Sequence, residues 1–553
     1  MYIYDQYDQK IIDQRVDQFR DQTQRYLAGK IGEDEYRILR LQNGVYVQIH
    51  APMLRVAIPY GLISSPQLRM LAHIARTYDK DYGHFTTRQN MQFNWPTLES
   101  VPDILAELAT VQMHAIQTSG NCMRNVTADH LAGISPDEIE DPRPYCEIIR
   151  QWSSLHPEFA YLPRKFKFAV SGAQHDRAAT QIHDIGIQLV RNDAGEVGFK
   201  ILVGGGLGRT PILAKVLNKF LPKPQLLSYL EAILRVYNME GRRDNMYKAR
   251  IKILVQSLGL EAFRDKVETE WLAIQQSTSA DLTLNEAEVA RVKAFFDNKQ
   301  YDADAAAFNL DEQCQSNRAF SHWVKQNTAP HKQAGYRAVF VSLKAPGNAP
   351  GDITAQQMER LADLADTYSQ GELRSTHDQN LVLADVRQAD LFALWQALDQ
   401  QDLATANIGT LTDMICCPGL DFCSLASAQS LSVAKQINDR FDKMDYLYDL
   451  GELRLKLSGC INACGHHHVG HIGLLGVDKK GSQWYQITLG GSAENEAALG
   501  QVLGRAVPID EVADALEKIL TVYVSQRLEG ESFLETYGRI GKQPFKEKLY
   551  ANH

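Results

Sequence analysis

The sequence lacks the long apolar run that a membrane helix needs. No window of its 553 residues approaches about 18 consecutive apolar side chains. The first ten residues, MYIYDQYDQK, have no apolar stretch of the kind found in secretory signals. Basic residues (58) do not outnumber acidic ones (67), and no basic tail is present, so neither a nucleic-acid scaffold nor a membrane partner is expected. These absences predict a globular, cytoplasmic protein that could still hold a local basic pocket.

Cysteine is also scarce. Eight cysteines in 553 residues are too few for a disulfide framework, and without an export signal they are expected to be reduced. Their distribution is uneven, because five fall within 49 residues: Cys416, Cys417, Cys423, Cys460 and Cys464. At roughly 150 residues per domain, the length predicts three to four domains.

An internal repeat organises the chain. Residues 63–90 match residues 353–380 without a gap, with ten of 28 positions identical. Each copy follows a strand-like run and reads as a helix that leads into a second strand. One such β-α-β half cannot cover both faces of its sheet, so we expect the two copies to pack together. Polar, turn-rich stretches at 275–282 and 326–335 are predicted linkers, and residues 8–28 an amphipathic helix.

The clustered cysteines form two spaced pairs, C-x5-C at Cys417 and Cys423 and C-x3-C at Cys460 and Cys464. Four thiolates from two loops suit a [4Fe–4S] cluster. A zinc site stays open as an alternative, although zinc pairs are usually separated by two to four residues. Inert buried thiols are the third interpretation. Cys416 could replace Cys417 as a ligand; the Pro-Gly that follows favours Cys417.

Basic residues recur in stretches where a packed core does not explain them: Thr86–Asn94, Asn121–Asn125, Asp141–Tyr145 and Tyr161–Ala169. We expect Arg88 and Gln92 to share one face of a strand, and Lys165 and Lys167 to point the same way. At the position of Arg88 the second copy of the repeat has Asp378. Together these stretches predict one anion pocket, formed by the first copy.

A glycine run, VGGGLGRTP, follows a strand at residue 203 and is expected to open a helix. It has no G-x-G-x-x-G register, so a nicotinamide dinucleotide is not predicted. The glycines would still allow a large anionic ligand to approach the backbone closely. The histidines that follow the last cysteine, His466–His468, are predicted to form a polar pocket wall.

Together, the motifs TTRQ, RNV, LPRKFK and LVGGGLG and the two cysteine pairs resemble the sirohaem-dependent sulfite and nitrite reductases. The resemblance covers about residues 40–545 and is nearest to the haemoprotein (beta) subunit of assimilatory sulfite reductase. It implies an α+β fold with pseudo-twofold duplication: two ferredoxin-like halves packed together, plus two larger α/β domains for sirohaem and cluster. The implied segments are 1–45 (helical extension), 46–120 and 326–405 (ferredoxin-like halves), 121–325 (first sirohaem/substrate domain) and 406–553 (cluster domain).

The resemblance also implies roles for single residues. Cys417, Cys423, Cys460 and Cys464 would hold the cluster, and Cys464 would also bridge to the sirohaem iron. Sirohaem carboxylates would be bound by a set of polar residues and loop glycines: Gln92, Arg124, Asn125, Asn462, Gly204, Gly205, Gly206 and Gly208. Substrate would bind among Arg88, Arg143, Lys165 and Lys167, with the arginines as clamps and the lysines as proton donors.

The implied reaction is the six-electron reduction of sulfite to sulfide. Nitrite-reducing relatives often lack the second lysine of the LPRKFK motif, so Lys167 favours the dianion sulfite over nitrite. Nitrite reduction to ammonia with ferredoxin is the alternative, and a zinc-stabilised, non-redox anion-binding protein is the second. The chain shows no flavin or NADPH module, so a flavoprotein reductase subunit or a ferredoxin is expected to supply electrons.

Overall fold

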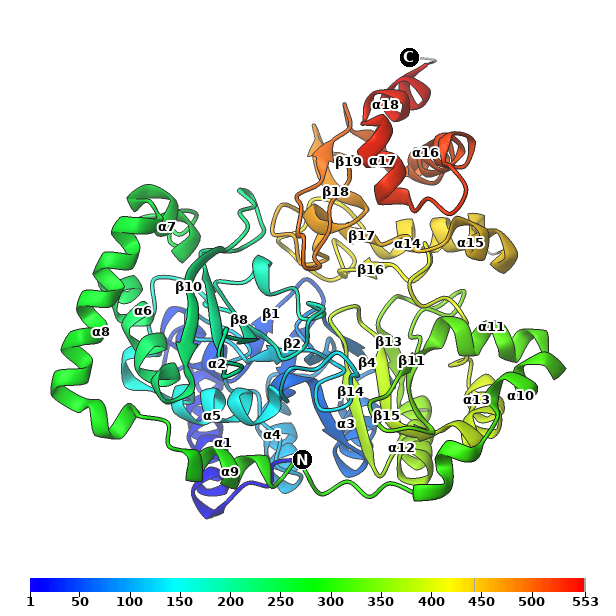
Figure 1. Cartoon of the computed structure of the whole chain (residues 1–553). Coiled ribbons are helices and arrows are strands. Elements are labelled where there is room, and N and C mark those ends of the chain that lie inside the picture. The colour runs from blue at the N-terminus through cyan, green and yellow to red at the C-terminus, as the bar shows by residue number, and fades with distance from the viewer. Residues whose placement is uncertain (442, 552–553) are drawn as a thin grey trace.

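The computed structural model describes residues 1–441 and 443–551 (Figure 1). Within them the chain is an α+β molecule with two smaller antiparallel sheets and two larger mixed sheets. The duplicated, pseudo-twofold architecture is therefore confirmed. No helix in the described ranges combines the length and the apolar character that a bilayer crossing requires.

The two smaller sheets exchange strands. The first has the order β1-β2-β5-β4-β13, and its last strand comes from the second copy of the repeat; the second has the order β11-β12-β15-β14-β3, and its last strand comes from the first copy. The first consists of β1 (Val45–Val47), β2 (Pro52–Val56), β5 (Met91–Phe93), β4 (Tyr82–Phe85) and β13 (Asp352–Thr354). The second consists of β11 (Thr328–Pro330), β12 (Tyr336–Val341), β15 (Leu381–Arg387), β14 (Glu372–Ser375) and β3 (Leu62–Ser64). Each half thus needs a strand from its partner.

The helices of the repeat, α3 (Ser65–Tyr78) and α12 (Ala355–Tyr368), pack against each other. Both begin with a capping box, formed by Ser64 and Gln67 in one copy and by Thr354 and Gln357 in the other. Ion pairs join their exposed faces, from Arg76 to Glu359 and from Arg69 to Asp363 and Asp366. The apolar faces of both helices belong to one continuous core. The expectation that the two copies pack together is confirmed.

The two larger sheets repeat one topology. The order β6-β7-β8-β9-β10 begins with parallel pairs and ends with antiparallel pairs, and β16 to β20 follow the same pattern, with β21 added on β19. The first comprises β6 (Thr127–Ala128), β7 (Phe168–Ser171), β8 (Ile185–Arg191), β9 (Val197–Val203) and β10 (Lys215–Pro222). The second comprises β16 (Ile415–Cys416), β17 (Leu455–Ser458), β18 (Ile472–Lys479), β19 (Ser482–Leu489), β20 (Gln501–Val502) and β21 (Val507–Pro508).

Helices cover the sheets, and the C-terminal group lies at one end of the molecule (Figure 1). The N-terminal part contains α1 (Gln6–Leu27), α2 (Glu33–Gln42), α4 (Val101–Thr110), α5 (Arg143–Ser153), α6 (Leu226–Glu240), α7 (Ile251–Leu258), α8 (Leu260–Leu282) and α9 (Glu286–Lys293). The remainder contains α10 (Leu310–Ser316), α11 (Arg318–Asn327), α13 (Leu391–Asp399), α14 (Leu431–Arg440), α15 (Met444–Leu450), α16 (Val512–Gln526), α17 (Phe533–Ile540) and α18 (Gln543–Tyr550).

Some local predictions are wrong. The stretch 275–282 is the end of helix α8, and the stretch 326–335 contains strand β11, so neither is a simple linker. The glycine run connects β9 to β10 and opens no helix. The predicted N-terminal helix is present as α1, and its buried face consists of Ile12, Val16, Phe19 and Thr23. The predicted segment boundaries stay a prediction, and residues 442 and 552–553 lie outside the described ranges.

Candidate active site

A cavity of about 1060 Å³ is lined by both larger domains and by the first smaller sheet. Most of the predicted site residues meet there, although they are far apart in the chain. They are Arg88, Gln92, Arg124, Asn125, Lys165, Lys167, Gly208, Cys417, Cys423, Cys460, Asn462 and Cys464. One wall carries cationic side chains and the other carries the cysteine loops.

The two lysines reach the cavity because they alternate with a core residue. Phe166 is fully buried, so Lys165 and Lys167 leave the extended segment before β7 on the opposite face. The Asp184 carboxylate accepts the backbone N–H of Lys167 at 2.9 Å and two charge-assisted bonds from Arg250 at 2.7 Å. Burial, then the nearby Arg124, lowers the pKa of Lys165 to about 8. Burial and Lys165 lower the pKa of Lys167 well below its usual value.

Arg88 and Arg124 add fixed charge to the same wall. Arg88 lies in the tight turn between β4 and β5, and its guanidinium donates to the Asn125 carbonyl at 2.6 Å and to Thr127 Oγ1 at 2.9 Å. Arg124 donates to the carbonyls of Thr118 and Gly120. Among the described residues, no carboxylate forms an ion pair with the side chain of either arginine or of the two lysines. Positively charged side chains without an ion-pair partner are suited to bind an anionic ligand.

Two loops of the second large domain carry the cysteines. Cys417 and Cys423 follow β16, and Cys460 and Cys464 follow β17. The backbone is tight at both loops: a Cβ on Gly465 would lie 1.9 Å from the Leu457 carbonyl oxygen. The Thr87 hydroxyl donates to the Cys464 carbonyl at 2.9 Å, which joins the turn of Arg88 to the cysteine loop.

Cys416 and Cys417 differ in what their sulfurs contact. Cys417 Sγ accepts the backbone N–H of Gly459 at 3.1 Å. Sulfurs that hold an iron–sulfur cluster commonly accept such backbone hydrogen bonds. Cys416 is fully buried in strand β16, and its thiol donates to the Cys417 carbonyl at 3.3 Å. The Cys416 backbone N–H is bound by Gln379 at 2.9 Å. We therefore keep Cys417 as the proposed ligand.

The cysteine set fits an iron–sulfur cluster better than a single metal ion. In the described part of the chain, no three cysteine, histidine or acidic side chains converge as a tetrahedral zinc site requires. A cluster needs sulfurs spread around a larger body. Burial raises the pKa of the Cys417 thiol to about 12 and raises that of Cys423 and Cys460, so metal binding must displace these protons.

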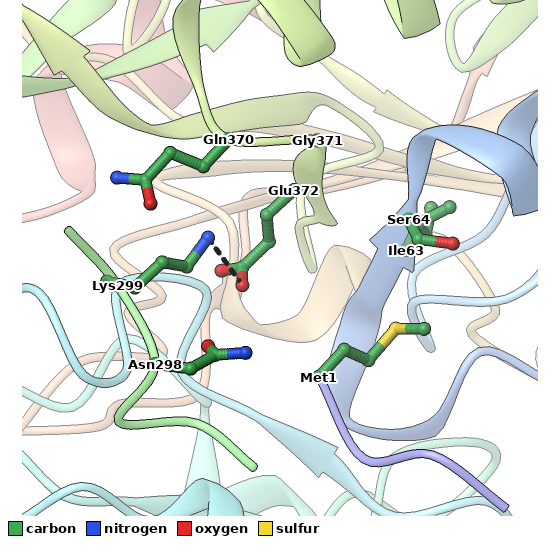
Figure 2. Close-up of a pocket in the computed structure, with 8 residues that line it drawn as sticks. All are labelled: Met1, Ile63, Ser64, Asn298, Lys299, Gln370, Gly371 and Glu372. Carbon is green, nitrogen blue, oxygen red and sulfur yellow. Dashed lines mark ion pairs between the residues drawn. The ribbon is translucent and has the colours of Figure 1, made fainter.

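Arg143 does not line the cavity. Its guanidinium is bound to Asp141, with Nη2 to Oδ2 at 2.8 Å, and Nη1 lies 3.7 Å from Glu372. Glu372 lines a separate cavity of about 200 Å³ beside Met1, where it also pairs with Lys299 at 3.1 Å (Figure 2). A guanidinium neutralised by two carboxylates is not free to bind an oxyanion. We therefore do not carry Arg143 into the proposed substrate site.

Only part of the glycine run reaches the cavity. Gly208 lines it, together with Leu207. Gly204 and Gly205 are packed under the loop, because a Cβ on Gly205 would lie 2.4 Å from the His183 carbonyl oxygen. Gly206 faces Arg250 and Lys252. The run therefore shapes one wall, and only Gly208 among the four predicted glycines lines the cavity.

Sequence reasoning missed several lining residues: Tyr46, Arg55, His183, Arg250 and Lys252. Arg55 interrupts the otherwise apolar strand β2, and its guanidinium donates to Gln92 Oε1 at 3.3 Å. Lys252 interrupts the apolar start of helix α7. A charged residue within an otherwise apolar element could have indicated that Arg55 and Lys252 belong to a site. The other three carry no such pattern.

In the second copy of the repeat, the charged residues at the positions equivalent to Arg88 and Lys167 neutralise each other. Asp378 occupies the place of Arg88, and Arg454 precedes β17 as Lys167 precedes β7. Arg454 Nη1 lies 3.7 Å from Asp378 Oδ2, so the two charges offset each other. Two like charges in one copy attract an anion, whereas two opposite charges in the other copy satisfy themselves.

Comparison with known proteins adds the family. The model of the nitrite and sulphite reductase 4Fe-4S domain matches residues 119–274 and 409–553. The model of the nitrite/sulfite reductase ferredoxin-like half domain matches residues 48–111 and 330–401. The matched ranges include both copies of the repeat and both cysteine pairs.

Curated relatives are of two kinds. An assimilatory ferredoxin-dependent nitrite reductase from Haloferax mediterranei is 29% identical over 87% of this chain and 80% of its own length. A sulfite reductase [ferredoxin] from Mycolicibacterium paratuberculosis is 28% identical over 87% and 81%. The solved structure of the Mycobacterium tuberculosis NirA protein is 25% identical, with a TM-score of 0.77 over 93% of this chain and 92% of that chain.

Proposed function

Because the chain belongs to the nitrite and sulfite reductase family, we propose that it reduces sulfite to sulfide by six electrons. It is an oxidoreductase of the sirohaem and [4Fe–4S] type. The observation that carries the choice of sulfite is the pair Lys165 and Lys167, which both face the cavity beside Arg88 and Arg124 without a carboxylate partner among the described residues. A dianion with three oxygens gains more from four cations than the monoanion nitrite does.

The proposed cofactor ligands follow from the two walls. Cys417, Cys423, Cys460 and Cys464 would hold the cluster, with Cys464 shared with the sirohaem iron. Gln92, Asn125, Gly208 and Asn462 line the cavity where sirohaem carboxylates need hydrogen-bond donors. When bound, the two groups would pass electrons from the external donor to the substrate and would supply the iron at which it is reduced.

The protein's own side chains would bind the oxyanion and deliver protons. Arg88 and Arg124 present planar guanidinium donors in a fixed geometry, so they would act as clamps. Burial lowers the pKa of Arg88 to about 9, so its clamp is charged at neutral pH. The sequence predicted Arg124 as a partner of sirohaem. Because Arg124 is a charged neighbour of Lys165, we propose instead that it contacts the substrate. The lysines have lowered pKa values and can release a proton to an oxygen that leaves as water.

The experiment that tests the substrate compares sulfite and nitrite on the purified holoenzyme. With a reduced viologen dye as donor, kcat/KM for sulfite is expected to exceed that for nitrite. A higher kcat/KM for nitrite would overturn the proposal and select the nitrite reductase alternative, which the relatives of that activity also support. The zinc-stabilised, non-redox alternative is not retained, since the chain matches a 4Fe-4S family.

We further propose ferredoxin as the electron donor, since curated relatives of both activities are described as ferredoxin-dependent. A reduced ferredoxin should sustain turnover without added flavoprotein. Turnover with NADPH and a flavoprotein reductase, but not with ferredoxin, would select the other donor. A cytoplasmic location is part of the same proposal, and the eight unpaired cysteines support a reducing compartment.

A further inference from the structure

The glycine loop between β9 and β10 is held by one lysine. Lys252 Nζ donates to the carbonyl oxygens of Gly206 at 3.1 Å, Leu207 at 2.7 Å and Thr210 at 2.6 Å. An ammonium group has three donors, so the whole donor capacity of this side chain is spent on one loop. The loop residues Leu207, Gly208 and Thr210 in turn line the large cavity.

Lys252 is unusual for a buried charge. It is 5% exposed near the start of helix α7, beside the buried Ile251. No described carboxylate lies within ion-pair distance of it, and burial lowers its pKa to about 8. A buried ammonium without a counter-ion is costly unless its hydrogen bonds are complete. The three carbonyls must therefore stay in place for the buried ammonium group of Lys252 to keep its hydrogen bonds.

A histidine holds the same loop from the other domain. His468 lies in the short 3-10 turn His467–Val469, four residues after Cys464, and its Nε2 is 3.0 Å from the Gly208 carbonyl oxygen. The proton must therefore sit on Nε2, which donates. A Cβ on Gly208 would lie 3.6 Å from the Ile461 carbonyl oxygen, so the glycine loop and the cysteine loop are in contact.

We propose that Lys252 and His468 are positioning residues that fix the glycine loop against the cysteine loop and thereby set the width of the cavity for a flat, carboxylate-bearing tetrapyrrole. Lys252 acts from the first large domain and His468 from the second. Through their hydrogen bonds to the glycine loop, the same two residues connect the cavity wall at Gly208 with the segment that carries Cys464. The inference rests on the cofactors of the family and is independent of the choice between sulfite and nitrite.

The test measures retention of sirohaem in the isolated holoenzyme. Lys252→Met keeps the length of the side chain and removes all three donors. His468→Leu removes the donor, whereas His468→Gln places an amide N–H near the same point. Sirohaem per chain and its rate of loss are followed by absorbance after repeated gel filtration, while iron and sulfide analysis follows the cluster.

Lys252→Met and His468→Leu are expected to lose sirohaem at least tenfold faster than the wild type, with the cluster retained. His468→Gln should lose it within about threefold of the wild-type rate. The double variant should fall short of the product of the two single effects, because both side chains hold one loop. Lys223→Met and His156→Gln, which lie outside the cavity lining, serve as controls and should match the wild type.

Three results would overturn the proposal. Loss rates equal to those of the controls would remove any role for the two residues. His468→Gln behaving like His468→Leu would mean that the imidazole only fills space. Fully multiplicative effects in the double variant would mean that the two side chains act on separate structures. None of these readouts depends on which substrate the enzyme prefers.

Discussion

The cationic wall of the cavity consists of a few side chains that form no ion pair with a described carboxylate. Arg88 and Arg124 donate to backbone carbonyls, and Lys165 and Lys167 form no ion pair among the described residues. Arg250, which lines the same cavity, is paired with Asp184, so the lack of an ion-pair partner is particular to these four side chains among the described residues. The overall net charge of −9 gives no sign of it.

Replacing Lys167 by asparagine should impair sulfite reduction more than nitrite reduction. One charge-assisted hydrogen bond contributes about 1.5–3 kcal/mol, or roughly 10- to 100-fold in kcat/KM. The loss is expected for sulfite, whereas nitrite should lose several-fold less. Steady-state kinetics with both substrates check this, with the exposed Lys215→Asn as control. Equal losses would count against a role in substrate choice.

The high-pH side of the activity profile should report Lys165. Burial and Arg124 lower its pKa to about 8, so it is protonated below that pH and loses its proton as pH rises through about 8. Activity that needs this proton should fall about tenfold per pH unit above that point. The profile is best measured with nitrite, whose charge does not change in this range. In Lys165→Arg the group stays charged, so a profile that still fell near pH 8 would contradict the assignment.

Cysteine variants should separate the two adjacent thiols. Cys417→Ser is expected to lose the cluster, because its sulfur faces the Gly459 amide at the cavity. Cys416→Ser should keep four irons per chain, since its thiol is buried in β16 and bonded to a carbonyl. Iron and acid-labile sulfide analysis decides. Cluster loss in Cys416→Ser alone would reverse the choice of ligand.

At the scale of elements, two pairs of identical residues in the repeat bind equivalent backbone groups in the two halves. Gln89 Oε1 accepts the backbone N–H of Ala128, and Gln379 Oε1 accepts that of Cys416. Asn90 and Asn380 likewise accept the N–H groups of Ile58 and Leu343. These side chains satisfy buried backbone donors in both halves, which gives a physical reason why the same residues stand at these positions of the repeat.

Removing one of these amides should destabilise the fold. Gln379→Leu leaves the Cys416 N–H and the Phe85 carbonyl without their partner, at a cost of about 1–3 kcal/mol for a buried unsatisfied group. Thermal unfolding of the variant should therefore begin several degrees lower. Gln18→Leu, on the exposed face of α1, is the control. An unchanged midpoint would show that the two bonds contribute little.

Other elements escaped prediction for physical reasons. Strands β3 and β13 have three residues each, too few for a period, so the exchange between halves could not be foreseen. The stretch after the glycine run contains apolar residues that suit either a helix or a strand, and it forms strand β10. Arg143 was misplaced because its partner Asp141 lies only two residues away and takes up its charge.

The whole molecule behaves as one unit because its two halves share sheets and core. Residues 1–325 lack β13, and residues 326–553 lack β3, while one apolar core includes side chains from both copies of the repeat. Edge strands without partners expose unpaired backbone groups. Neither part contains both the cationic wall and the cysteine loops.

Each part expressed alone is therefore expected to aggregate or to lack fixed tertiary structure. Co-expressed parts 1–325 and 326–553 should assemble into one complex that binds sirohaem and the cluster. Size-exclusion chromatography and near-UV circular dichroism test this. A soluble, cooperatively unfolding 1–325 fragment would contradict the dependence on the exchanged strand.

The strand exchange also sets an order of events on the ribosome. The first small sheet stays open at β4 until residues 352–354 have been synthesised, and the last cysteine of the cavity, Cys464, follows more than a hundred residues later. Chains usually fold one domain at a time as they emerge. Here the first half must wait for the second, so cofactor loading is expected only after both the exchanged strand and Cys464 have been synthesised.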